Sequence, residues 1–132
     1  MVLASGSFDG VHEGHRAFLA AALRVCGPQD RLVVAVAPDD YIRREKHREP
    51  VWPIGERLAM VRRCPGVAVT VPHGTTGAAD VIRELRPRLF VKGIDWVARL
   101  PEDVRLACHA VGCLVVYVDS GSPLHTSTLG AR

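Results

Sequence analysis

Short, uniformly apolar segments recur along the chain, and they constrain its fold more than any other feature. Five of them are rich in Val, Leu and Ala: Met1–Ser5, Arg31–Ala37, Val67–Val71, Leu89–Lys92 and Leu114–Val118. Apolar runs of this length are typical of strands that are buried on both faces of a parallel sheet. Such a sheet needs helices on both sides to cover it.

Segments with helical periodicity lie between these apolar runs. They are His15–Cys26, the stretch in which Ile54, Leu58 and Val61 have i, i+4, i+7 spacing, Ala78–Leu85 and Glu102–Val111. Alternating strands and helices predict an α/β fold with right-handed crossovers. We expect a single domain over residues 1–132, with a doubly wound (Rossmann-like) five-stranded parallel sheet and helices on both faces. In such sheets ligands bind at the carboxyl ends of the strands.

Composition and charge narrow the class of protein. Hydrophobic residues make up 48% of the chain, and the formal net charge of +3 suits an anionic substrate but gives little support for nucleic acid as a partner. No apolar run approaches the roughly 18–20 residues that span a bilayer, so we expect no membrane partner. The absence of a secretory signal predicts a cytoplasmic protein whose four unpaired cysteines are reduced.

The loop after the first apolar segment carries the strongest chemical signal. It reads Gly6-Ser7-Phe8-Asp9-Gly10-Val11-His12-Glu13-Gly14-His15. Its glycines allow a sharp turn, and the helix that follows presents unpaired N–H groups to a phosphate. His12 and His15 add two hydrogen-bond donors, which suits the stabilisation of a phosphoryl group in transit. A zinc-peptidase site is excluded because Arg16 stands four residues after His12.

This loop resembles the HxGH signature of the nucleotidyltransferase superfamily in its G-x-F-D-x-x-H-x-G-H form. The resemblance implies transfer of a nucleoside monophosphate from an NTP to a phosphorylated small molecule, with release of pyrophosphate. It implies that His12 and His15 are catalytic and that Asp9 supports the loop or the acceptor. The nucleotide contacts implied are Ser7, Phe8, Gly14 and His15. The implied Mg²⁺ cofactor is held mainly by the nucleotide phosphates rather than by a protein site.

A basic segment follows the second apolar run. Six basic residues lie between Arg43 and Arg57, His47 included, in what the two prolines there indicate is a stiff loop. Because this segment follows a strand, we expect Lys46 to act on an anion as a catalytic residue. The expected acceptor contacts are Arg44, Arg48 and Trp52. Binding of DNA or RNA by this segment is a weaker alternative.

Parts of the basic segment resemble the sugar-phosphate adenylyltransferase domain of the bifunctional heptose kinase/adenylyltransferase. The matching residues are Arg48, Pro50, Val51, Pro53, Glu56 and Arg57, with Glu49 as an interruption. Glu56 and Arg57 are expected to be structural as much as functional.

The run Leu89–Trp96 is similar to the V-K-G-x-D-Y/W segment of the same heptose-phosphate enzymes. Glycerol-3-phosphate cytidylyltransferase has a related G-D-D-W without the lysine. The resemblance therefore favours ATP slightly over CTP, and a sugar or polyol phosphate as acceptor. We expect Lys92 to contact phosphate, Gly93 to let the base approach, and Asp95 either to bind a hydroxyl or to cap a turn.

The C-terminal segment resembles the family's I-S-T-T element, which binds nucleotide phosphates. Its candidate residues are Thr126, Ser127 and Thr128, and it departs from the family pattern at His125. That departure keeps an alternative open, a catalytically silent nucleotide-binding regulatory module of the same fold. The resemblance also suggests a homodimer. Between the third strand and the next helix, His73–Gly77 is expected to be a flexible loop in which Thr76 caps the helix.

Overall fold

A computed structural model describes residues 1–119 of the chain. Its five described strands form one sheet in the order β3-β2-β1-β4-β5, and each neighbouring pair is parallel. The strands are β1 (Val2–Gly6), β2 (Leu32–Val36), β3 (Val67–Pro72), β4 (Leu89–Gly93) and β5 (Leu114–Val118). The prediction of a five-stranded parallel α/β sheet is confirmed.

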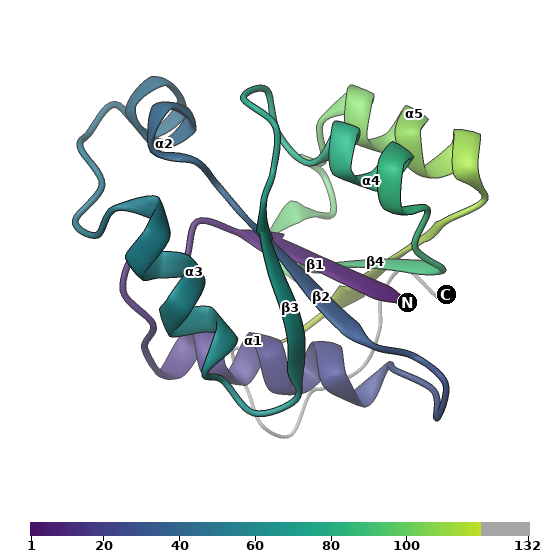
Figure 1. The fold of residues 1–132 in the computed structure, drawn as a ribbon. Coiled ribbons are helices and arrows are strands. Elements are labelled where there is room, and N and C mark those ends of the chain that lie inside the picture. The colour runs from purple at the N-terminus through teal and green to yellow at the C-terminus, as the bar shows by residue number, and fades with distance from the viewer. Residues whose placement is uncertain (120–132) are drawn as a thin grey trace.

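Helices cover both faces of this sheet (Figure 1). The described helices are α1 (Glu13–Arg24), α2 (Asp39–Lys46), α3 (Ile54–Arg62), α4 (Ala79–Leu85) and α5 (Glu102–Val111), with the 3-10 helix η1 (Ile94–Trp96) after β4. Helices α1 and α3 pack on one face, whereas α4 and α5 pack together on the other. Within residues 1–119, no helix is long and apolar enough to cross a bilayer.

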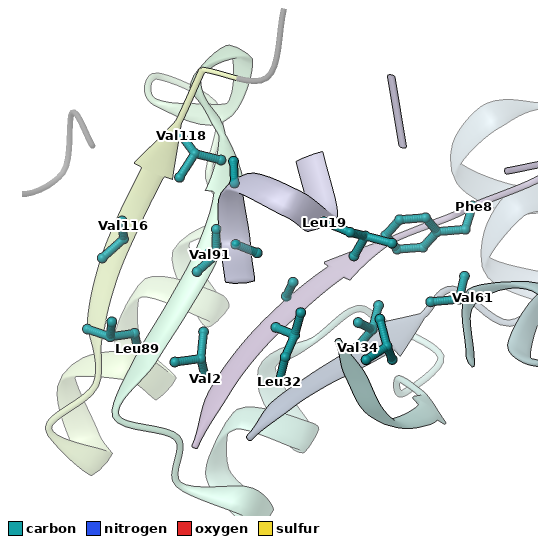
Figure 2. Packing of buried hydrophobic residues seen from close by; sticks show 14 of the residues in the cluster. Val2, Phe8, Leu19, Leu32, Val34, Val61, Leu89, Val91, Val116 and Val118 are labelled. Carbon is teal, nitrogen blue, oxygen red and sulfur yellow. The ribbon is translucent and has the colours of Figure 1, made fainter. Parts of the chain in front are cut away.

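Alternate residues of the central strand β1 enter two different cores. Val2 and Ala4 pack with residues of α1 and α3, in the cluster shown in Figure 2, while Leu3 packs with residues of α4 and α5. All three side chains are fully buried. Burial on both faces is the reason that this strand is a continuous apolar run in the sequence. The edge strands are less covered, and Leu114 of β5 is 69% exposed.

The segment after β2 was predicted to be a loop, and this prediction is wrong because it contains helix α2. Pro38 precedes the helix, two aspartates occupy its first turn, and three basic residues lie in its last turn. These charges complement the helix dipole. Ile42 is its one fully buried residue, so α2 lacks the apolar stripe by which the other helices could be predicted.

Candidate active site

A cleft of about 760 Å³ opens at the carboxyl ends of the strands. Its floor includes Ser5 and Gly6 of β1 and Lys92 and Gly93 of β4, while His73 closes the end of β3. The HxGH loop, α2 and η1 supply its walls. This is the position at which doubly wound sheets bind ligands, because the strand order reverses beside β1.

His12 is the N-cap of α1, and its ring orientation is fixed by that role. Its Nδ1 accepts a hydrogen bond of 3.1 Å from the backbone N–H of Gly14. In the neutral ring the proton must therefore be on Nε2, which makes Nε2 a donor. A Cβ at Gly14 would lie 3.0 Å from Cε1 of His12, so glycine lets the ring take this position without a shift.

His15 stacks on His12 with their ring centroids 3.9 Å apart. Burial, followed by the neighbouring His12 and Lys46, lowers the pKa of His15, although the backbone of Gly10 acts in the opposite direction. Its Nδ1 is enclosed and has no hydrogen-bond partner among residues 1–119. In the neutral tautomer that carries its proton on Nε2, His15 can donate one hydrogen bond to a phosphoryl oxygen.

Lys92 brings a buried positive charge to the floor of the cleft. Its Nζ lies 3.2 Å from the carbonyl oxygen of Ser5, 3.3 Å from that residue's Oγ, and 4.3 Å from the centroid of the Trp96 ring. Burial lowers the pKa of Lys92 to about 8, against the opposing effect of Asp95. The ammonium therefore remains mostly charged at neutral pH. The chain contains two lysines, and both Lys46 and Lys92 line the cleft.

Asp9 joins the HxGH loop to the segment after α2. Its carboxylate accepts hydrogen bonds from Arg48 at 2.6 Å, from the backbone N–H of Val51 at 2.8 Å and from that of Trp52 at 2.9 Å. Burial alone would raise the pKa of Asp9, but these hydrogen bonds outweigh it and lower the pKa. Its side chain is only 4% exposed, so Asp9 supports the loop rather than presenting a free carboxylate.

Arg57 of α3 is fully buried and connects several backbone segments beneath the cleft. Its guanidinium donates hydrogen bonds to the carbonyl oxygens of Ser7, Ala37 and Trp52 at 2.8, 2.6 and 2.7 Å. It also forms a 2.6 Å ion pair with Asp39. The expectation that this arginine has a structural role therefore agrees with its contacts.

Comparison with known proteins identifies the family. Residues 3–128 match the profile described as cytidylyltransferase-like. The chain belongs to the cytidylyltransferase-like family. The predicted superfamily and the prediction of a nucleotidyltransferase-type enzyme are confirmed.

Several nucleotidyltransferase relatives are similar in sequence. The chain is 40% identical over 93 residues to the bifunctional protein HldE of Gluconacetobacter diazotrophicus. This match covers 70% of this chain and 19% of that protein. It is 38% identical over 109 residues to the FAD synthase of Thermococcus onnurineus, covering 79% of this chain and 70% of that one. The chain thus spans about a fifth of the HldE proteins that it matches.

A solved structure supports the same fold. The lipopolysaccharide core biosynthesis protein from Thermoplasma volcanium GSS1 superposes with a TM-score of 0.67 at 26% identity. The match covers 80% of this chain and 85% of that protein.

The structure brings most of the predicted nucleotidyltransferase residues together. The predicted residues that line the cleft are Ser7, Phe8, Asp9, His12, Gly14, His15, Lys46, Arg48, Lys92, Gly93 and Asp95. Phe8 does so with a side chain that is only 2% exposed and packs against His15. The predicted phosphate contacts Thr126, Ser127 and Thr128 lie outside the described residues.

Two predicted acceptor contacts lie outside the wall of the cleft. Arg44 donates hydrogen bonds to Glu45 at 3.0 Å and to the carbonyl oxygen of Thr75. Trp52 is 42% exposed, and its indole lies against Gly10. Both residues hold the loops around the cleft, and their contact with an acceptor stays a prediction.

The cleft residues that were not assigned to the site from the sequence include Tyr41, Glu45, His73 and Arg99. Tyr41 belongs to the missed helix α2, and Arg99 stacks on Trp96 with 4.9 Å between its guanidinium carbon and the ring centroid. His73 could have been found from its position directly after a strand. The expectation that Thr76 caps α4 is wrong, because Ala78 is the N-cap and no side chain bonds there.

Proposed function

We propose that this chain transfers an adenylyl group from ATP to a phosphorylated sugar or polyol. A phosphate oxygen of the acceptor attacks the α-phosphorus of ATP, and a new P–O bond forms. The bond between the α-phosphorus and the bridging oxygen breaks, and its electron pair leaves with pyrophosphate. The acceptor phosphate is already ionised near neutral pH, so no strong base is needed.

The observation that carries this proposal is the stacked pair of His12 and His15 at the N-terminus of α1. Neutral imidazoles donate hydrogen bonds to phosphoryl oxygens, and the helix N-terminus adds the positive end of its dipole. Lys46 and Lys92 supply two cationic groups in the same cleft. These groups suit the negative charge that moves onto the leaving pyrophosphate.

Two kinds of relatives support ATP as the donor. HldE is named a bifunctional protein, and the resemblance of Leu89–Trp96 to the heptose-phosphate enzymes favours an adenylyltransferase role for the part that this chain matches. FAD synthase makes, by its name, a product that contains an adenylyl group. Lys92 and Gly93, which resemble the heptose-phosphate enzymes, favour a sugar phosphate as acceptor. FMN is the competing acceptor that the second kind of relative suggests.

The chemistry of the cleft bears on how Mg²⁺ would bind. Within residues 1–119, no three His, Cys, Asp or Glu side chains are grouped so that they could hold a metal ion. Asp9 is occupied by its three donors, and most charged groups lining the cleft are cations. We infer that Mg²⁺ enters with the triphosphate and takes its ligands mainly from phosphate oxygens and water, where it offsets triphosphate charge.

Pyrophosphate release tests this function. The assay pairs ATP or CTP, with and without Mg²⁺, with heptose 1-phosphate, mannose 1-phosphate, glycerol 3-phosphate or FMN. We expect Mg²⁺-dependent release with ATP and a sugar phosphate. Tight ATP binding without release for any acceptor would instead favour the silent regulatory module. Light scattering on the same sample tests the predicted homodimer.

A further inference from the structure

His73 is a buried titratable residue of the cleft that the reaction above does not use. It follows the edge strand β3, and its backbone N–H donates a 2.9 Å hydrogen bond to the carbonyl oxygen of Val36. The residue is 8% exposed, and its ring meets the ring of Tyr41 edge to face with centroids 4.7 Å apart. The ring is therefore held at one place on the wall of the cleft.

The hydrogen bond at Nδ1 fixes the tautomer of this ring. Nδ1 lies 2.7 Å from the carbonyl oxygen of Gly74, which also accepts the N–H of Gly77 at 3.1 Å. A carbonyl oxygen can only accept, so Nδ1 must carry the proton. In the neutral ring, Nε2 is then left with a lone pair.

The surroundings of His73 keep its ring neutral. Burial lowers the pKa of His73, and the positive charges of Lys92 and Arg57 lower it further, against the opposing effect of the Gly74 carbonyl. Within residues 1–119, Nε2 has no hydrogen-bond partner, and it is not enclosed as Nδ1 of His15 is. Nε2 thus offers a lone pair to the contents of the cleft, next to groups that otherwise attract anions.

We propose that Nε2 of His73 accepts a hydrogen bond from a hydroxyl of the phosphorylated acceptor, and that His73 thereby determines which acceptor is used. This inference rests on the proposed function. A phosphate oxygen cannot take this position, because two acceptors facing each other repel. The hydroxyl-bearing part of the acceptor therefore lies at β3, while its phosphate lies nearer the HxGH loop.

The sheet order gives the reason for assigning this hydroxyl to the acceptor rather than to the nucleotide. The proposed nucleotide contacts Lys92 and Gly93 belong to β4, on one side of β1. β2 and β3 lie on the other side, and the reacting groups must meet above β1, where the histidine pair stands. The second reactant thus occupies the β3 side, where Tyr41 and His73 form the wall.

The test compares His73→Phe, which keeps a ring against Tyr41 but removes the lone pair, with His73→Gln, whose amide oxygen can replace Nε2 as acceptor. Exposed His109 on α5 provides the matched control His109→Phe. With saturating ATP, we expect His73→Phe to lower kcat/KM for the sugar phosphate about tenfold, mainly through KM. His73→Gln should retain more activity, and ATP affinity should not change in either variant.

Deoxy analogues of mannose 1-phosphate identify the hydroxyl. For one of them, kcat/KM with the native chain should be lower than kcat/KM for mannose 1-phosphate. With His73→Phe, the same analogue and mannose 1-phosphate should give equal kcat/KM. Equal kcat/KM for the native chain and His73→Phe would overturn the inference while leaving the proposed function intact. Absence of turnover in the native chain would instead refute the proposed function.

A binding measurement decides the inference independently of turnover. The ¹⁵N resonance of Nε2, assigned by its loss in His73→Phe, should report an unprotonated nitrogen in the free protein. Mannose 1-phosphate should shift this resonance, whereas inorganic phosphate should not. An equal shift with inorganic phosphate, or no shift with any of the sugar phosphates, would overturn the inference.

Discussion

Lys92 is expected to make the protein less stable at neutral pH than a version with an apolar residue in its place. Its pKa falls from the ordinary 10.5 to about 8 because burial penalises the charged form. This difference corresponds to about 3 kcal/mol against the folded state at pH 7. The two hydrogen bonds to Ser5, at about 1 kcal/mol each, offset part of it. Lys92→Met should therefore raise the free energy of unfolding at pH 7 by about 1 kcal/mol.

The pH dependence of this effect gives the sharper test. Between pH 8 and 10.5 the unfolded chain keeps the proton on Lys92 while the folded chain releases it. Stability of the native chain therefore rises with pH in this window, by roughly 2–3 kcal/mol between pH 7 and pH 10. Lys92→Met lacks this gain in stability. Its excess in free energy of unfolding over the native chain should therefore shrink as pH rises and then reverse in sign.

Urea unfolding of both proteins at pH 7, 8, 9 and 10 measures the difference directly, because other titrating groups cancel. Lys46→Met is the matched control, since Lys46 is exposed in the same cleft and its replacement also removes a lysine charge, but not a buried one. A constant difference between the native chain and Lys92→Met across this range would refute the reasoning. It would mean that Lys92 is solvated in the folded protein.

Three further changes test the site. His15→Ala should lower kcat by roughly 10²–10³ with unchanged circular dichroism, because one donor to the transferred phosphoryl group is lost; an unchanged rate would exclude that role. Arg57→Met should cost about 3–5 kcal/mol in urea unfolding, because it leaves several buried acceptors and Asp39 unpaired, whereas exposed Arg63→Met should cost little. Asp9, whose pKa is lowered in the fold, stabilises the native chain above about pH 4 and loses this effect as pH falls through its folded pKa. The stability gap to Asp9→Asn should therefore be constant above about pH 5 and shrink below about pH 4 in thermal melts.

The sheet and the HxGH loop could be predicted because local sequence determines both. Doubly buried strands such as β1 appear in the sequence as continuous apolar runs. Glu102–Val111 was predicted with its observed bounds, and in the structure Pro101 is its N-cap and Gly112 its left-handed C-cap. Helix α2 could not be predicted in the same way, because it buries little more than Ile42 and is held by contacts distant in sequence.

The site was predictable where a motif names its residues and unpredictable where the topology assembles them. His12 and His15 lie in one loop, so their spacing indicates their proximity. The approach of His73 to Lys92 depends on the order of the sheet, in which two strands, β2 and β1, lie between β3 and β4, and no local sequence pattern reports this order. The hydrogen-bond partners of Asp9 could not be predicted from the sequence either, since they lie about 40 residues further along the chain.

The contacts of Asp9 and Arg57 set a condition for redesigning this protein. The stretch from Asp39 to Trp52 is fastened at both ends to groups outside it, by Asp9 from the HxGH loop and by Arg57 from α3. A chimera that imports this stretch from a relative, in order to change the acceptor, must carry matching partners at both anchoring positions. A graft that replaces Asp39 or Arg48 without regard to these anchors would remove the ion pair of Arg57 or that of Asp9. The unit of exchange in this enzyme is therefore the stretch together with its two anchors.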